Sequence, residues 1–459
     1  MVFRVSRARL SCKPERRKPT MPKTLPTTGK PSADVLADLR AMHGEDAKWK
    51  DGKTFSLVYF AGDEVSQLLK DAYGEFIAEN GLSPVAFPSL RKMECEVVSM
   101  AASLFHGDED VAGTMTSGGT ESIMMAVKAA RDFAKKTRGI TAPEMVVPCT
   151  IHPAFDKAAH YFGVKILHAK TRPDFRVDLE DLERLITPNT ALIVGSAPPY
   201  PHGVIDPISD LAALATKKGV WCHVDACLGG FFLPFAEKLG RPIPPWDFRV
   251  PGVHSISADL HKYGYAAKGA SVVLYRNAGL RRNQFFTWGG WNGGLYASPS
   301  FCGTRPGGAI AAAWAVMHHL GEAGYLARAK SVLASTEKLK AGINSTPGLR
   351  VLGEPHAGVF SFGSDSLNVY ELGDAMDAHG WKLDRQMDPP ALHCMVTPAH
   401  EKVADVFVKD LKECAASLAA GHAAPEGSAA MYGMVGAIGD RSQVNEFLLD
   451  FLDGLFERV

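Results

Sequence analysis

The feature that most constrains the fold is an alternation of apolar and helical segments between about residue 110 and residue 280. Six apolar runs have the length and composition of buried strands, at 144–149, 165–169, 191–197, 219–226, 253–258 and 270–275. Helical patterns lie between several of these runs, at 120–139, 152–163 and 209–219. Because strands that are apolar along their whole length are buried on both faces, the pattern predicts an α/β fold whose mostly parallel sheet carries helices on both faces.

The rest of the sequence divides the chain into three expected regions. Residues 1–75 are expected to form an N-terminal arm, flexible to about residue 35, and a helical segment, and residues 76–325 a large cofactor-binding domain that contains the sheet. Residues 326–459 are expected to form a smaller C-terminal α+β domain. There, helical patterns alternate with shorter strand-like pieces, at 358–364 and 391–397.

Composition narrows the possible partners. The 459-residue chain holds 50 Lys and Arg against 50 Asp and Glu, so no overall charge attracts nucleic acid or a membrane surface. No run of 18 or more apolar residues occurs, and we therefore expect no transmembrane anchor. Seven of the first twenty residues are Lys or Arg, but no apolar segment follows them to complete a signal peptide.

The cysteines indicate a reducing compartment. None of the eight forms a CxxC pair, and a chain of this length does not need disulfides to be stable. This spacing favours free thiols in a cytoplasmic protein, with secretion into a host cell left open, and it predicts no metal site.

The segment TSGGTES, residues 116–122, precedes a strongly helical stretch. Its two glycines let the backbone approach a ligand closely, and the free N–H groups at a helix N-terminus suit a phosphate. The segment matches neither GxGxxG nor the nucleotide P-loop, so neither a dinucleotide nor ATP is indicated. A glycine turn followed by a threonine N-cap is the structural alternative.

Two polar residues come after apolar runs, at the position where ligands bind in open α/β sheets. Asp225, in HVDA (223–226), is placed to pair with a protonated ring nitrogen, or else to cap a helix or form a salt bridge. His152 comes after VVPCT and is placed to stack on a planar ring, or else to start a helix or fill the core.

The segment SADLHKYGY, residues 257–265, places His261 and Lys262 where two apolar runs meet. A charged lysine in an apolar, partly desolvated site is costly, and we expect its pKa to be lowered. The neutral amine is then a nucleophile that forms a Schiff base with an aldehyde. A surface lysine whose ammonium reaches the solvent is the alternative.

Together these features favour one cofactor. Pyridoxal 5'-phosphate requires an anion site, a ring-facing side chain, an aspartate for its pyridine nitrogen and a lysine for its aldehyde. The aspartate keeps the ring protonated, so that it accepts electrons when a carbanion forms on the substrate.

The same motifs carry a family resemblance. FPSLRKMECEVVSMAASLF, TSGGTESIMMAVKAARD, HVDACLGGF, SADLHKYGYAAKG and GTRPGG are similar to segments of fold-type I pyridoxal-phosphate enzymes of the group II decarboxylase superfamily. Within it the chain resembles sphingosine-1-phosphate lyases of bacterial type, from about residue 59 to the C-terminus. The resemblance implies a homodimer with shared active sites. It also implies cleavage of the C2–C3 bond of a phosphorylated sphingoid base, which yields a long-chain aldehyde and phosphoethanolamine.

The resemblance implies roles in cofactor binding. Lys262 is expected to hold the cofactor covalently, Asp225 to pair with the pyridine nitrogen and His152 to stack over the ring. The cofactor phosphate is expected to contact Gly119, Thr120, His261 and Thr304, the last of these from the neighbouring subunit.

Substrate contacts follow from the same resemblance. Tyr59, Lys268 and Tyr200 are similar to residues that contact the substrate, the first two chiefly through its phosphate. Lys262, Tyr200 and the cofactor phosphate are candidates for the proton transfers. The sequence does not choose among them.

One position departs from the family pattern. Ser83, in NGLSPVAFP, stands where the lyases carry a histidine that helps to grip the substrate phosphate. A serine donates one hydrogen bond but carries no charge, which puts substrate preference in question more than reaction class.

Two alternative functions remain open on the same fold. An amino-acid decarboxylase needs a cation for a carboxylate where the lyase needs a phosphate site, and Lys268 with Tyr59 favours the lyase. A non-catalytic relative tends to lose its lysine, so the complete set of Lys262, Asp225 and His152 weighs against it.

Overall fold

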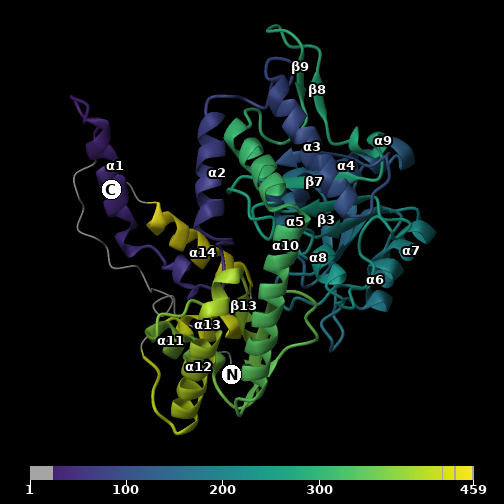
Figure 1. The fold of residues 1–459 in the computed structure, drawn as a ribbon. Coiled ribbons are helices and arrows are strands. Elements are labelled where there is room, and N and C mark those ends of the chain that lie inside the picture. Colours follow the sequence, from purple (N-terminus) through teal and green to yellow (C-terminus); the bar gives the residue numbers. More distant parts are fainter. Residues whose placement is uncertain (1–23, 426, 439–440, 457–459) are drawn as a thin grey trace.

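The computed structural model describes residues 24–425, 427–438 and 441–456, and these form a seven-stranded sheet, a four-stranded sheet and a separate two-stranded hairpin (Figure 1). The large sheet has seven strands in the order β1-β7-β6-β5-β4-β2-β3. Its strands are Ala112–Thr116 (β1), Glu144–Pro148 (β2), Lys165–Ala169 (β3), Thr190–Ser196 (β4), Trp221–Asp225 (β5), Ser255–Ala258 (β6) and Ser271–Tyr275 (β7).

The sheet confirms the predicted mostly parallel arrangement. β6, β5, β4, β2 and β3 run parallel, whereas β7 is antiparallel to both of its neighbours, β1 and β6. All six predicted strands are present, but β1 was not predicted. Its sequence, AGTMT, contains a glycine and two threonines, so it lacks the apolar run that marks the other strands.

Helices cover both faces of this sheet. The helices of this part of the chain span Ser32–Met42 (α1), Asp63–Glu75 (α2), Pro88–Leu104 (α3), Gly119–Arg138 (α4), Ala154–Phe162 (α5), Leu179–Leu185 (α6), Ile208–Lys218 (α7), Leu233–Lys238 (α8), Ala278–Arg281 (α9) and Gly307–Asn344 (α10). Of these, α1 has no buried residue and lies apart from the sheet (Figure 1). Short 3-10 helices lie at His43–Glu45 (η2) and Trp49–Asp51 (η3). None of the described helices combines the length and the apolar character needed to cross a bilayer.

Alternate residues of the central strands enter two separate apolar cores. Val146 and Ile193 pack in one core with residues of α7, while Met145 and Leu192 pack in the other with residues of α4 and α5. Successive side chains of a strand point to opposite faces, so the continuous apolar runs of the sequence feed both cores. Because both faces of the sheet are buried in apolar cores, polar side chains gather at the ends of its strands.

The C-terminal part contains the second sheet, which is antiparallel in the order β10-β11-β13-β12. Its strands and helices are Leu349–Val351 (β10), Val359–Ser364 (β11), Val369–Ala378 (α11), Asp384–Met387 (β12), Pro390–Met395 (β13), Pro398–Lys402 (η4), Ala404–Ala419 (α12), Ala429–Ala437 (α13) and Arg441–Leu455 (α14). α10 runs between the two sheets and bends at Gly321, so the expected domain boundary near residue 325 falls inside this helix (Figure 1). The boundary stays a prediction.

The N-terminal region packs against this second sheet. The N–H of Phe55 donates to the carbonyl of Lys382, and the carbonyl of Phe55 accepts from Met395. The Phe55 side chain is fully buried. Of the predicted flexible arm, residues 1–23 lie outside the described residues, and α1 begins at Ser32, within the arm's expected span.

A glycine in the loop after β4 sets how closely the two sheets approach each other. Gly203 has φ +68°, and a Cβ atom there would lie 1.8 Å from the carbonyl oxygen of Val359 in β11. Gly240 has φ +84°, but no described atom lies within 4 Å of the same position. The two glycines share the left-handed backbone and differ in the space around them.

We predict that Gly203→Ala destabilises the protein more than Gly240→Ala. The backbone strain costs about 1 kcal/mol at either site, and the clash with β11 adds about 1–3 kcal/mol at Gly203 alone. Thermal unfolding followed by circular dichroism measures both variants. Equal midpoints for the two would contradict the close approach.

Candidate active site

Lys262 lies just beyond β6, in the turn that leads to β7. Its Nζ atom is 3.0 Å from Oδ2 of Asp259, and its side chain is 22% exposed. Asp259 is almost completely buried, and its Oδ1 has no hydrogen-bond partner among the described residues. The turn therefore holds an ammonium group against a carboxylate that most of the solvent does not reach.

The expected lowering of the Lys262 pKa is wrong for the protein alone. Burial does lower this pKa, but the carboxylate of Asp259, with Cys227 and Asp225, outweighs burial and raises it. The expectation rested on desolvation alone, whereas Asp259, three residues earlier in the chain, supplies an anion. In this arrangement Lys262 carries a full charge near neutral pH, so it must release a proton before it acts as a nucleophile.

Asp225 lies at the end of β5 and His152 lies just beyond β2, with β4 between these two strands of the large sheet. Asp225 closes β5, and its Oδ1 accepts hydrogen bonds from the Cys227 N–H at 3.0 Å and the Ser257 hydroxyl at 3.4 Å. His152 precedes α5, and its Nδ1 accepts from the N–H of Ala154. Partial loss of water lowers the pKa of His152, and the charges of Asp225 and Lys262 both act on it. His152, Asp225 and Lys262 thus share one electrostatic environment.

Gly119 brings the N-terminus of α4 against this group. A Cβ atom there would lie 2.7 and 2.9 Å from the two carboxylate oxygens of Asp259 and 3.0 Å from Sγ of Cys227. A Cβ atom on Gly118 would lie 3.1 Å from the ring of His261. The two glycines therefore let the helix start close to the Lys262 turn, and Thr120 is exposed there. The phosphate role of the TSGGTES segment stays a prediction.

Lys268 and Tyr59 form a second group of side chains near Lys262. Lys268 is exposed, with Nζ 2.8 Å from the carbonyl of Leu57 and 5.6 Å from the centre of the Tyr59 ring. Partial loss of water and the charge of Lys262 lower the pKa of Lys268. Burial raises the pKa of Tyr59 strongly, and the charges of Asp259 and Tyr200 raise it further. The predicted substrate contacts Tyr59, Lys268 and Tyr200 are thus brought together.

Thr304 and Ser83 lie in two segments that pair with each other. The side chain of Asn80 donates to the Thr304 hydroxyl at 3.2 Å, and Gly81 donates to the carbonyl of Arg305. Ser83 and Thr304 are both exposed. Within the described part of the chain, neither of them forms a hydrogen bond or ion pair with Lys262. The structure therefore gathers the Lys262 group but leaves Ser83 and Thr304 at its margin.

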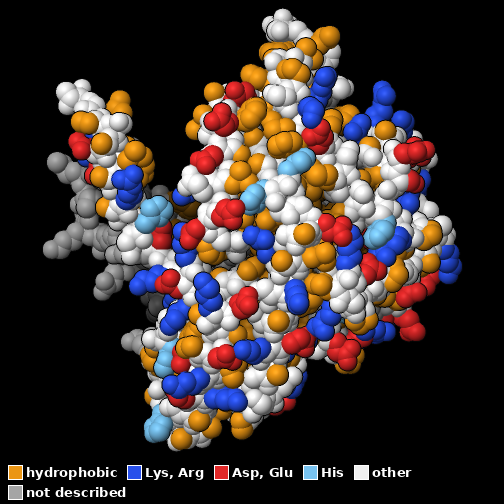
Figure 2. Space-filling view, in the orientation of Figure 1, with side chains coloured by type: hydrophobic (Ala, Val, Ile, Leu, Met, Phe, Trp, Pro, Cys, Tyr) orange, Lys and Arg blue, Asp and Glu red, His pale blue; other side chains and the backbone are white. Residues whose placement is uncertain are grey.

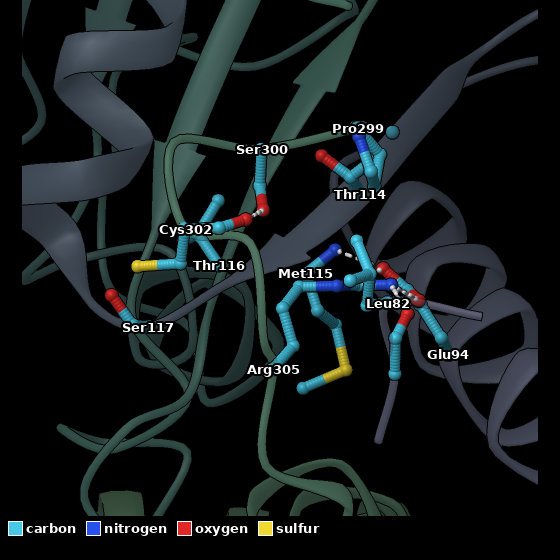
Figure 3. Close-up of polar contacts among 12 residues, drawn as sticks. Leu82, Glu94, Thr114, Met115, Thr116, Ser117, Pro299, Ser300, Cys302 and Arg305 are labelled. Carbon is cyan, nitrogen blue, oxygen red and sulfur yellow. Dashed lines mark hydrogen bonds and ion pairs between the residues drawn. The ribbon is translucent and has the colours of Figure 1, made fainter. Parts of the chain in front are cut away.

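A buried ion pair fixes this margin to the large sheet. Arg305 donates from both terminal nitrogens to the two carboxylate oxygens of Glu94, and Glu94 accepts from the N–H of Met115 in β1 (Figure 3). Both side chains are more than four-fifths buried, so loss of either partner would strand a charge, at a cost of about 3–5 kcal/mol.

A cavity of about 40 Å³ separates the margin from the start of α4. It is lined by Thr116, Ser117, Gly269, Cys302 and Thr304 among others, and Figure 3 shows Cys302 pointing toward Ser117. Thr304 and the first two residues of the glycine-rich segment therefore line the same cavity.

Comparison with known proteins decides the family. The Pyridoxal-dependent decarboxylase conserved domain matches residues 14–364. Sphingosine-1-phosphate lyase 1 of Rattus norvegicus is 46% identical over 438 residues, covering 95% of this chain and 77% of the rat protein. The chain belongs to the sphingosine-1-phosphate lyase family.

Solved structures agree with this family. A sphingosine-1-phosphate lyase from Burkholderia pseudomallei K96243 superposes with a TM-score of 0.87 at 40% identity, covering 95% of this chain and 97% of that one. A glutamate decarboxylase from Lactobacillus brevis has a TM-score of 0.75 at 21% identity over 88% of this chain and 96% of that one. The second likeness is one of fold alone. The predicted fold class and family are confirmed.

The residues present fit the cofactor of this lyase family, pyridoxal 5'-phosphate. The amine of Lys262 is partly exposed, the carboxylate of Asp225 is buried beside it, and a Cβ atom would fill the space at Gly119. A phosphate suits the free N–H groups in the first turn of α4. A planar ring with an aldehyde, a basic nitrogen and a phosphate matches these donors and acceptors.

The sequence analysis missed Asp259, which makes the shortest charged contact of Lys262 in this lyase-family site. Asp259 lies within the quoted SADLHKYGY segment, and its spacing of three residues before Lys262 was the available signal. It also missed Asp384, whose carboxylate accepts from the Tyr200 hydroxyl. That contact joins residues 184 apart, so no local signal marks it.

We predict that Asp259→Asn lowers the pKa of Lys262 in the cofactor-free protein. Without this carboxylate, burial opposes the ammonium with its largest counter-charge gone, so the pKa of Lys262 falls. NMR titration of isotopically methylated lysines measures the shift, with the Lys262 signal assigned by its loss in Lys262→Arg. Asp156→Asn removes an exposed carboxylate and serves as the control. An unchanged Lys262 pKa in Asp259→Asn would refute the assignment.

Proposed function

We propose that this protein is a pyridoxal-phosphate-dependent lyase that cleaves the C2–C3 bond of phosphorylated sphingoid bases. The products are a long-chain aldehyde and phosphoethanolamine. The observation that carries the proposal is the placement of two lysines. Lys262 lies with Asp225 at the strand ends, and Lys268 lies exposed beside Tyr59 in the same loop. The first suits the cofactor aldehyde and the second an anionic headgroup.

In the proposed site this chain's own residues hold the cofactor. Lys262 supplies the amine that binds it covalently, Asp225 accepts from its protonated ring nitrogen, and His152 lies against its ring. When bound, the cofactor supplies an electron sink for the carbanion that forms as the C2–C3 bond breaks. Its phosphate is assigned to the N-terminus of α4 and nearby side chains, namely Gly119, Thr120, His261 and Thr304.

The substrate phosphate is assigned to Lys268 and Tyr59, with Ser83 at the margin. Lys268 offers a point charge, and the Tyr59 hydroxyl stays protonated because burial raises its pKa, so it donates a hydrogen bond. The neutral Ser83 hydroxyl adds no charge to this group. Lys262 and Tyr200 are the side chains assigned to the proton transfers at the C3 hydroxyl and C2.

The deciding experiment is incubation of the purified holoenzyme with sphingosine-1-phosphate. We expect release of a long-chain aldehyde and phosphoethanolamine, detected by mass spectrometry. Release of carbon dioxide from an amino acid without any aldehyde would instead establish the decarboxylase. A protein that never develops the absorbance of the lysine-bound cofactor would establish the non-catalytic relative.

We predict that Lys262→Ala abolishes cleavage while the fold survives. The lysine supplies the only covalent link assigned to the cofactor. Its removal leaves the buried Asp259 carboxylate without its cation, which lowers the unfolding midpoint but leaves both apolar cores intact. Aldehyde release and the thermal unfolding midpoint measure the two effects separately. Lys135→Ala, an exposed lysine on α4, is the matched control and should keep full activity. Substantial turnover in Lys262→Ala would contradict the covalent role.

The proposal includes a homodimer with shared active sites. The hairpin formed by Phe286–Trp288 (β8) and Tyr296–Ser298 (β9) projects from the body and carries exposed apolar side chains, Trp288 at 57%, Trp291 at 53% and Leu295 at 91% (Figures 1 and 2). None of the eleven residues of α1 is buried either. Large exposed apolar groups mark interaction surfaces. The hairpin leads directly into the segment of Thr304, which supports the assignment of a second copy as the partner.

We predict that Trp291→Asp together with Leu295→Asp weakens the dimer, because each buries a charge at the proposed interface. Sedimentation velocity over a range of concentrations measures the change. Tyr161→Asp, an exposed aromatic on α5, is the control and should leave association unchanged. A wild-type protein that sediments as a monomer would exclude the homodimer.

The proposed location is the cytoplasm. The seven cysteines among the described residues are all free thiols, which supports a reducing compartment.

A further inference from the structure

Tyr200 belongs to the loop after β4 of the large sheet, but its side chain is held by the small sheet. Its hydroxyl donates to Oδ2 of Asp384 at 2.6 Å. Its ring stacks on His393 with a centroid distance of 4.0 Å and an interplanar angle of 22°. The Tyr200 carbonyl accepts from Nε2 of His393 at 3.0 Å. Two contacts thus hold the Tyr200 side chain and a third holds its backbone carbonyl, all from the small sheet.

The two partners of Tyr200 are neighbours in the small sheet. Asp384 in β12 lies opposite His393 in β13 in the antiparallel register. Ser56 donates to the other carboxylate oxygen of Asp384 at 3.2 Å, so both oxygens accept from hydroxyl groups. The carboxylate is therefore oriented on both sides.

His393 is a neutral partner. It is fully buried, and burial lowers its pKa to about 4, so it carries a single ring proton near neutral pH. Since Nε2 donates that proton to the Tyr200 carbonyl, Nδ1 carries none, and it has no partner among the described residues. The charge that acts on the Tyr200 hydroxyl at close range is that of Asp384.

We propose that Asp384 is a positioning residue. Its carboxylate accepts the hydrogen bond that the Tyr200 hydroxyl donates, so that the Tyr200 oxygen is left to accept hydrogen bonds from the substrate. This inference rests on the proposed function. A phenol has one proton and two lone pairs, and the proton is already used at 2.6 Å. Only lone pairs remain for the substrate hydroxyl. If Tyr200 takes the C3-hydroxyl proton, its own proton moves to Oδ2 of Asp384, and no free phenolate forms.

The surrounding charges agree with this assignment. Burial raises the pKa of Tyr200, and the Asp384 carboxylate raises it further. The other titratable groups that face the hydroxyl from the packed elements are Tyr432, Cys394, His393 and Tyr59. None of these is a cation, so nothing in this group stabilises a phenolate.

The test uses holoenzyme with Asp384→Asn, Tyr200→Phe and the double variant. Ring-labelled tyrosine NMR follows the Tyr200 signal, assigned by its absence in Tyr200→Phe. We expect Asp384→Asn to lower the Tyr200 pKa, because it removes the opposing charge and keeps the shape. We also expect kcat to fall about 10-fold or more with KM changed less than about 3-fold, because the substrate still binds but the proton has no acceptor.

The double variant separates positioning from a purely structural effect. If Asp384 acts through Tyr200, adding Asp384→Asn to Tyr200→Phe costs little further activity. Asp365→Asn, an exposed carboxylate that follows β11, controls for the change of charge and should match wild type. An unmoved Tyr200 titration, or fully additive losses in kcat, would overturn the proposal. A wild-type enzyme that releases no aldehyde would overturn the proposed function instead, and the titration would still decide the role of Asp384.

Discussion

A sheet that is buried on both faces can place charged chemistry only where its strands end. In this protein β2, β4, β5 and β6 run parallel, so their carboxyl ends lie along one edge. The residues that follow those ends in the chain are His152, Tyr200, Asp225 and Lys262. The two apolar cores that cover the faces thereby also determine where the candidate site lies.

The charges at this edge balance one another. Lys262 is buried enough for its charge to be costly, yet the carboxylates of Asp259 and Asp225 make the charged form the stable one. Gly119 allows the start of α4 to approach the same carboxylate, so the N-terminus of this helix and the lysine both lie close to Asp259. The small sheet also shapes the site, because its residues Asp384 and His393 set the position of Tyr200, which lies in a loop of the large sheet.

Local patterns predicted most of the fold and much of the site. The six apolar runs appear as strands because an unbroken apolar stretch has few other stable places in a folded chain. β1 was not predicted because its sequence contains few apolar residues, and pairing with β7 is what stabilises it. In the site, Lys262, Asp225 and His152 each follow a strand and come together as expected. Asp259 was not predicted as a site residue, because acidic residues near lysines are also common on protein surfaces, where such pairs contribute little. Only its burial, which the sequence does not show, makes the pair strong.

The sequence by itself determined that the chain forms a mostly parallel sheet, and that a lysine, an aspartate, a histidine and a glycine-rich turn stand at its strand ends. These features depend on side-chain periodicity and on neighbours along the chain. Tertiary structure alone decided the charge state of Lys262 and the orientation of Tyr200. Electrostatic energy depends on distance and solvent access, and the contacts of Tyr200 with Asp384 and His393 span more than 180 residues. Such contacts exist only once the two sheets have packed.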